Sequence, residues 1–180
     1  MSDASPIVIL GIPIPSSDPL FLAIVGVHFV FGLAAVVTSA VAMLSSKGRG
    51  QHSYAGSIYF WSLGGVFLTM SALSFMRWAE DRSLFILGVL SFALACFGRA
   101  AVRGQWRQWP RLHLTGMGAS YIVMLTAFYV DNGPNLPLWK ELPEIAFWFL
   151  PGAIGVPFIL QAALRHPLVL HLDRGHRHLS

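Results

Sequence analysis

The stretch Leu20–Leu44 reads LFLAIVGVHFVFGLAAVVTSAVAML, and its one ionisable side chain is His28. An apolar run of this length meets the ~20 residues that a helix needs to cross a hydrocarbon layer of about 30 Å. Four more runs of similar length follow, at about Tyr54–Met76, Ser83–Val102, Pro110–Val130 and Ile145–Leu164. The sequence therefore predicts an all-α fold, a polytopic membrane helix bundle with about five transmembrane helices.

The composition agrees with a lipid environment. Of the 180 residues, 55% are hydrophobic and only 11% are charged, whereas a soluble domain carries about 25% charged residues. The net charge of +4 does not indicate a nucleic-acid partner, because the basic residues lie in short loops and form no helical stripe. The single cysteine, Cys96, lies inside an apolar run, where we expect an ordinary buried or lipid-facing side chain.

The distribution of Lys and Arg predicts the orientation. With the N-terminus outside, nine of the 12 basic residues face the cytoplasm, where such residues are enriched. These nine are Lys47, Arg49, Arg99, Arg103, Arg107, Arg111, Arg165, Arg174 and Arg177. We expect a short external tail (1–19), a five-helix transmembrane domain (20–164) and a cytoplasmic tail (165–180) containing His and Arg. The predicted location is a bacterial cytoplasmic (inner) membrane, with the C-terminus in the cytoplasm.

Small residues predict where helices touch, because they let backbones approach closely in lipid. The candidates are Ala34-xxx-Thr38-xxx-Ala42, Gly64-Gly65 and Gly116-xxx-Ser120. The fifth run contains Pro151 and Pro157, and a proline inside a helix favours a kink.

His28 is the first candidate for function, because an ionisable group within a membrane span is costly. It lies about eight residues into the first run, roughly 12 Å deep at 1.5 Å per residue. One interpretation is a core histidine bonded to a Ser, a Thr or a backbone carbonyl. The other is an axial haem or metal ligand, with Met70 or Met124 at the same depth as its partner.

His52 and His113 form a second candidate pair. One precedes the second run and the other lies in the first turn of the fourth, so both are expected near the cytoplasmic face. Two histidines from separate helices can bind a haem iron or a transition metal. The alternative is that each caps a helix start or binds interfacial water. Arg49, Arg107 and Arg111 nearby suit haem propionates, lipid phosphates or a quinone headgroup.

The cytoplasmic tail carries the remaining histidines, His166, His171, His176 and His178. A His-rich tail can bind metal, and a solvated tail touching anionic lipid is the alternative. No hydrolase, kinase or nucleotide-binding motif is present in the sequence, and no residue is assigned a catalytic role. Whether the chain is an enzyme is left open.

Several segments resemble a family of small bacterial polytopic membrane proteins, the domain of unknown function number 2306. They are His28-Phe-Val-Phe-Gly32, Lys47-Gly-Arg-Gly-Gln-His52-Ser-Tyr-Ala-Gly56 with Ile58-Tyr-Phe-Trp61, His113-Leu-Thr-Gly-Met117-Gly-Ala-Ser-Tyr121, Leu125-Thr-Ala-Phe128 and Leu150-Pro-Gly-Ala-Ile-Gly-Val-Pro157. The resemblance covers most of residues 24–160 and implies that His28, His52 and His113 belong to the family's recurring pattern. Where the family usually has an Arg after the second histidine, this chain has Ser53.

Three hypotheses for function follow. The first is a haem- or metal-binding redox or electron-transfer membrane protein, in which His28, His52 and His113 bind the cofactor (haem b or a transition metal) and His52 with His113 are the metal ligands. The second is a non-catalytic accessory or assembly subunit of a larger respiratory or photosynthetic complex. The third is transport of a small solute. The expected partners are the lipid bilayer and other membrane subunits or a second copy of the chain, and no nucleic acid.

Overall fold

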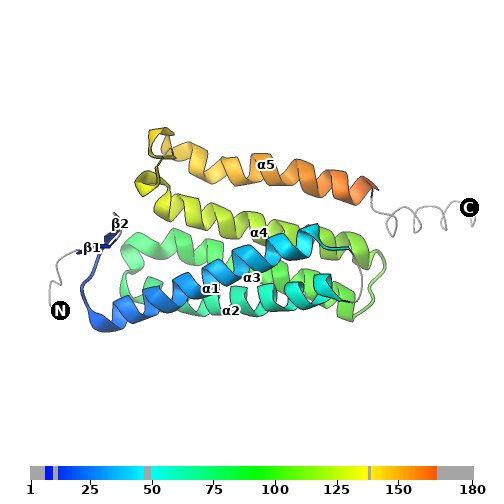
Figure 1. Cartoon of the computed structure of the whole chain (residues 1–180), viewed down its shortest axis with the longest axis horizontal. Helices are drawn as coiled ribbons and strands as arrows, with labels where there is room; N and C mark the ends of the chain where they lie inside the picture. The colour runs from blue at the N-terminus through cyan, green and yellow to red at the C-terminus, as the bar shows by residue number, and fades with distance from the viewer. Residues whose placement is uncertain (1–6, 10–11, 47–49, 138, 166–180) are drawn as a thin grey trace, which may run out of the picture.

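The computed structural model describes residues 7–9, 12–46, 50–137 and 139–165, and five long helices make up most of them (Figure 1). They are α1 (Pro19–Leu44), α2 (Gln51–Met76), α3 (Trp78–Arg103), α4 (Trp109–Asn132) and α5 (Glu144–Arg165). Two 3-10 turns, η1 (Gly133–Asn135) and η2 (Trp139–Glu141), lie between α4 and α5. Each of the five helices is long and apolar enough to cross a membrane. The chain is a multi-pass membrane protein, and the predicted all-α bundle is confirmed.

The N-terminal segment contains a small element that the sequence did not predict. Strands β1 (Ile7–Ile9) and β2 (Ile12–Ile14) pair antiparallel, with Ile7 opposite Ile14. Strands of three residues are too short for a period-2 pattern to stand out. The Asp18 carboxylate then begins α1 by accepting a hydrogen bond from the Phe21 N–H at 2.9 Å, as a helix N-cap does.

Two helices begin earlier than the apolar runs suggested. The second run was expected from Tyr54, and α2 begins at Gln51. The third was expected from Ser83, and α3 begins at Trp78 with Glu80 and Asp81 in its first turn. Carboxylates are favourable at the N-terminal end of a helix, so the polar residues that ended the apolar pattern still belong to the helix.

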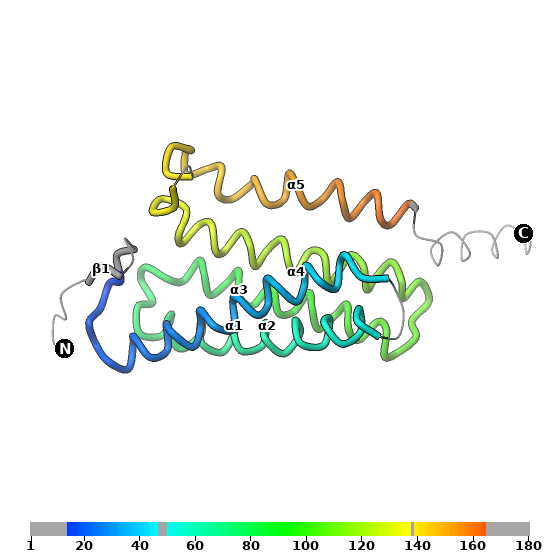
Figure 2. The backbone as a smooth tube through the Cα atoms, viewed as in Figure 1, coloured from blue at the N-terminus to red at the C-terminus, as the bar shows by residue number. Residues whose placement is uncertain are grey.

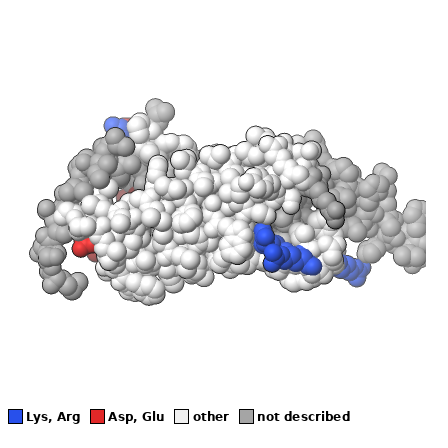
Figure 3. Space-filling view, turned by 60° about the horizontal axis from the view of Figure 1, so that its bottom comes forward, with Lys and Arg blue, Asp and Glu red and all other residues white. Residues whose placement is uncertain are grey.

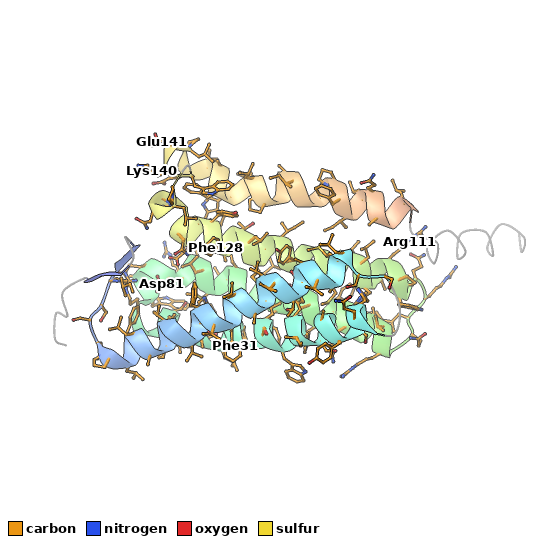
Figure 4. All side chains as sticks on the ribbon, viewed as in Figure 1. Phe31, Asp81, Arg111, Phe128, Lys140 and Glu141 are labelled. Atoms are coloured by element: carbon orange, nitrogen blue, oxygen red, sulfur yellow. The ribbon has the colours of Figure 1, made fainter. Side chains whose placement is uncertain are left out.

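Helices α1 to α4 pack together, and α5 lies along α4 on the outside (Figures 1 and 2). Asp81, Lys140 and Glu141 lie at one end of the bundle and Arg111 at the other (Figure 4). We call these the Asp81 end and the Arg111 end. Because the helices alternate in direction, α1 and α3 end at the Arg111 end, and α2 and α4 begin there.

The core lies where α1, α2, α3 and α4 meet. Its buried residues are Ala35, Tyr59, Phe60, Leu63, Ala95 and Met124, and Cys96 packs against them, half-buried. Hydrogen bonds cross this core. The Ser120 hydroxyl donates to the Met117 carbonyl at 2.7 Å, so the Tyr59 hydroxyl is the donor to Ser120 Oγ, also at 2.7 Å. Ser91 Oγ donates to the Ser120 carbonyl at 2.8 Å. Together these bonds tie α2 and α3 to α4.

Glycine makes the closest helix crossing. A Cβ on Gly116 would lie 2.8 Å from Gly98 Cα and 2.9 Å from the Leu94 carbonyl oxygen, so the backbones of α3 and α4 touch there. Gly116 and Ser120 are both buried, which confirms the contact predicted from Gly116-xxx-Ser120. A Cβ on Gly65 would lie 2.6 Å from the Phe31 ring, so Gly64-Gly65 also marks a real contact, between α2 and α1.

On α1 the small-residue prediction was correct at Ala42 and wrong at Ala34 and Thr38. The buried small residues are Ala35, Ser39 and Ala42, whereas Thr38 donates within its own helix to the Ala34 carbonyl. Small residues occur at neighbouring positions here, so the sequence leaves the register of the contact face ambiguous.

The Gly98–Gly116 crossing makes a direct test of this packing. We expect Gly116→Ala to destabilise the protein by about 1–3 kcal/mol, because the new methyl group collides with backbone that has no side chain to move aside. The thermal midpoint should fall by about 2–4 °C per kcal/mol. Gly26→Ala is the matched control, because a Cβ there meets nothing within 4 Å. Equal midpoints for the two variants would contradict the crossing.

Candidate functional site

The structure brings His52 and His113 together at the Arg111 end. Their rings come from the N-terminal parts of α2 and α4, and the ring centroids lie 6.2 Å apart with an interplanar angle of 81°. The sequence had predicted only that both lie near the same face of the membrane. Contact between the two imidazoles is therefore a result of how the four central helices pack.

His52 is held by the end of α1. The last carbonyls of a helix have no N–H partner within the helix, and α1 ends at Leu44. The Ala42 carbonyl lies 2.8 Å from His52 Nδ1. This bond fixes the orientation of the His52 imidazole at the start of α2. The expected alternative was that His52 caps the start of its own helix, whereas the bond caps the C-terminal end of α1.

His113 is held by α3. It precedes Gly116 by three residues, which puts the two on the same face of α4. The close crossing of Gly116 with Gly98 brings the Gly98 carbonyl to 3.1 Å from His113 Nδ1. A larger residue at either glycine would separate the helices and lengthen this bond. Gly98 was not among the residues singled out from the sequence, although a glycine on each of two neighbouring helices was the available signal.

The two hydrogen bonds specify the tautomer of each ring. A carbonyl oxygen only accepts, so Nδ1 carries the proton in both His52 and His113. A neutral imidazole has one N–H, so its Nε2 then carries the lone pair. Histidines that bind metals usually donate their other N–H to a carbonyl or carboxylate in this way. Both rings are thus in the form that can coordinate a metal through Nε2.

The surroundings of the pair are basic. Four arginines lie at this end: Arg99, Arg103, Arg107 and Arg111. The acidic side chains of the described residues all lie toward the Asp81 end; they are Asp18, Glu80, Asp81, Asp131, Glu141 and Glu144. The described part of the chain holds no group of three or more His, Cys, Asp or Glu side chains that could bind a metal ion. Lys47, Arg49 and the tail histidines His166, His171, His176 and His178 lie outside the described residues.

His28 has a different environment. Thr69 Oγ1 lies within donating distance of the carbonyls of Gly65 and Val66, at 2.8 and 3.0 Å, so its proton is engaged there. His28 Nδ1 lies 2.9 Å from the same oxygen and is then the donor. This confirms the interpretation of His28 as a core histidine bonded to a Thr. Thr69 follows His52 by about 25 Å along α2, so the structure separates His28 from the His52–His113 pair.

No family model, curated protein or solved structure matches the chain. The resemblance to domain of unknown function number 2306 stays a prediction. The interpretation of the site therefore depends on its own geometry.

The His28–Thr69 bond leads to a measurable coupling between α1 and α2. In a double-mutant cycle of His28→Ala and Thr69→Val we expect a coupling free energy of about 0.6–1.7 kcal/mol, the range found for such bonds within membranes. Reversible unfolding in mixed detergent micelles gives the four free energies of unfolding. Ser71 bonds only the Phe67 carbonyl of its own helix, so the cycle of His28→Ala with Ser71→Ala should couple by much less. A coupling of zero in the first cycle would disprove the bond.

Proposed function

We propose that this membrane protein binds haem through His52 and His113 and serves in electron transfer. The observation that supports the proposal is the pair of imidazoles on two helices, 6.2 Å apart, each with Nδ1 bonded to a backbone carbonyl. Two metal–nitrogen bonds of about 2 Å each, with about half an imidazole ring at either end, span roughly 6 Å between centroids. The observed separation agrees with that length.

The donor set favours haem over a bare metal ion. Zinc sites take three or four protein ligands, and the described residues offer two imidazoles at this place. Haem brings nitrogen ligands of its own, so His52 and His113 would be the two protein ligands that it needs. The arginines at this end add a second reason, because guanidinium groups bind carboxylates such as haem propionates.

Two protein ligands also restrict the chemistry. With both His52 and His113 holding the haem, it would supply electron transfer rather than the binding of oxygen or a substrate. Its place at a bundle end, inside a membrane, suits exchange of electrons with another membrane component. His52 and His113 would hold the iron, and the carbonyls of Ala42 and Gly98 would orient the two rings.

The absorption spectrum tests this proposal. Protein purified from haem-replete cells, or supplied with haemin in detergent, should show a Soret band at about one haem per chain, as expected from one pair of axial ligands. His52→Gln and His113→Gln should each lower the haem content at least tenfold, because each removes one of two protein ligands. His28→Gln is the control, since glutamine can still donate to Thr69, and it should keep the band. A colourless protein that takes up no haemin would refute the proposal, as would a double variant that retains the band.

We also propose that the protein lies in a bacterial inner membrane with the Arg111 end in the cytoplasm, on the basis of the charge distribution. Cysteine accessibility tests this orientation. Ser46 and Asn135 are exposed and lie at the Arg111 end and the Asp81 end. A membrane-impermeant maleimide should label Asn135→Cys in intact cells and Ser46→Cys only after lysis, with Cys96→Ser as the background. The reverse pattern would refute the orientation.

A further inference from the structure

The side of α2 that faces away from the core carries an apolar groove of about 350 Å³. Gly64 and Gly65 line its floor, the Phe31 ring of α1 packs directly against Gly65, and the Phe92 ring of α3 forms the wall beside Gly64. Figure 4 places Phe31 beside α2, on the outside of the bundle. Trp61 also lines the groove and is 68% exposed, so the groove opens to the hydrocarbon of the membrane.

The Phe92 wall is part of a set of packed aromatic rings. Phe92 stacks on Phe67 with centroids 5.3 Å apart and an interplanar angle of 9°. It also contacts Phe60 at 5.7 Å, and Phe60 contacts Trp61 at 5.4 Å. These contacts connect the groove to Phe60 without an intervening polar side chain.

A cation lies where this aromatic surface ends. The Arg99 guanidinium carbon is 4.6 Å from the centroid of the Phe60 ring. Arg99 follows Phe92 by two helical turns on α3, about 10 Å nearer the Arg111 end, and Arg103 follows by one turn more. Like charges four residues apart on a helix repel. Among the described residues neither arginine has a carboxylate within ion-pair distance; the described ion pairs are Arg77–Asp81 and Lys140–Glu141.

Figure 3 turns the α2 side of the bundle toward the viewer. It shows uncharged surface over the middle of the molecule and a patch of basic side chains toward one end. The apolar groove lies at membrane depth, and Arg99 lies about 10 Å from it toward the Arg111 end. This arrangement matches an anionic amphiphile, whose hydrocarbon chain would lie in the groove and whose charged group would meet Arg99.

We propose that this face binds an anionic phospholipid, with one acyl chain in the groove over Gly64 and Gly65 and the phosphate on Arg99. The groove is lined by carbon-rich side chains and glycine, which suit a hydrocarbon chain. A guanidinium binds phosphate through two parallel N–H donors and relieves the repulsion between Arg99 and Arg103. The haem proposal plays no part in this inference.

Quenching of tryptophan fluorescence tests the lipid site on the full chain in vesicles. Trp61 lines the groove, so the emission lost in Trp61→Phe reports on it, and Trp148→Phe on α5 is the matched control. Brominated phosphatidylglycerol should quench the Trp61 emission at a mole fraction about fivefold lower than brominated phosphatidylcholine, the preference expected for one arginine near the membrane surface. Equal quenching by the two lipids would overturn the proposal.

Variants distinguish lipid binding at a specific site from general attraction of anionic lipids to a basic surface. Arg99→Gln should remove the fivefold preference, Arg99→Lys should keep most of it, and Arg82→Gln, at the other end of α3, should leave it unchanged. Gly64→Leu should reduce quenching by both lipids, because its side chain would enter the groove. A preference that survives Arg99→Gln, or that Arg82→Gln removes equally, would overturn the proposal.

Discussion

The bundle depends on one constraint: hydrocarbon offers no hydrogen bond, so each polar group within the membrane needs a partner in the protein. Tyr59 meets this constraint through Ser120, Ser91 through the Ser120 carbonyl, and His28 through Thr69. Among the described residues no buried side-chain nitrogen or oxygen lacks a partner. Since lipid is as apolar as leucine, helices gain little from apolar burial against one another. These bonds, with the Gly98–Gly116 crossing, therefore decide which helix faces meet.

The sequence predicted the helices well, because hydrophobicity over ~20 residues is a strong signal. It predicted the helix contacts less well. Gly116-xxx-Ser120 was correct, although Thr115 and Ala119 offer the same spacing one residue earlier, whereas on α1 the face lies at Ala35 and Ser39 rather than Ala34 and Thr38. A membrane helix is apolar on all sides, so the polar–apolar alternation that gives the face of a soluble helix is missing.

For the candidate site the sequence could suggest the residues but not their chemistry. The shared level of His52 and His113 followed from the order of the spans. Their contact, and the protonation of both rings at Nδ1, depend on the carbonyls of Ala42 and Gly98. A backbone carbonyl is present at every residue and leaves no mark in the sequence. The partner of His28 could not be predicted either. The sequence allowed a Ser, a Thr or a backbone carbonyl, and the packing of α1 on α2 decides that it is Thr69.

The two ends of the bundle differ in their charged side chains. At the Asp81 end, Arg77 lies 3.7 Å from the Asp81 carboxylate, and Ser74 donates to the Asp81 carbonyl at 3.4 Å. Acids and bases are mixed there and compensate one another. At the Arg111 end, described arginines occur without a described carboxylate nearby. That end attracts anions, which a mixed end does not.

This excess of positive charge bears on both proposed ligands. A bare divalent ion between His52 and His113 would add positive charge beside Arg111, two residues before His113, whereas haem propionates would offset it. Arg99 lies on α3 over the Phe60 ring, about two helical turns beyond Phe92 of the groove, where the proposed lipid phosphate would meet it. The arginines thus divide by position: Arg111, close to His113 in the chain, suits an anionic cofactor, and Arg99 suits an anionic lipid. Both follow from a basic end that has no acidic side chain among its described residues.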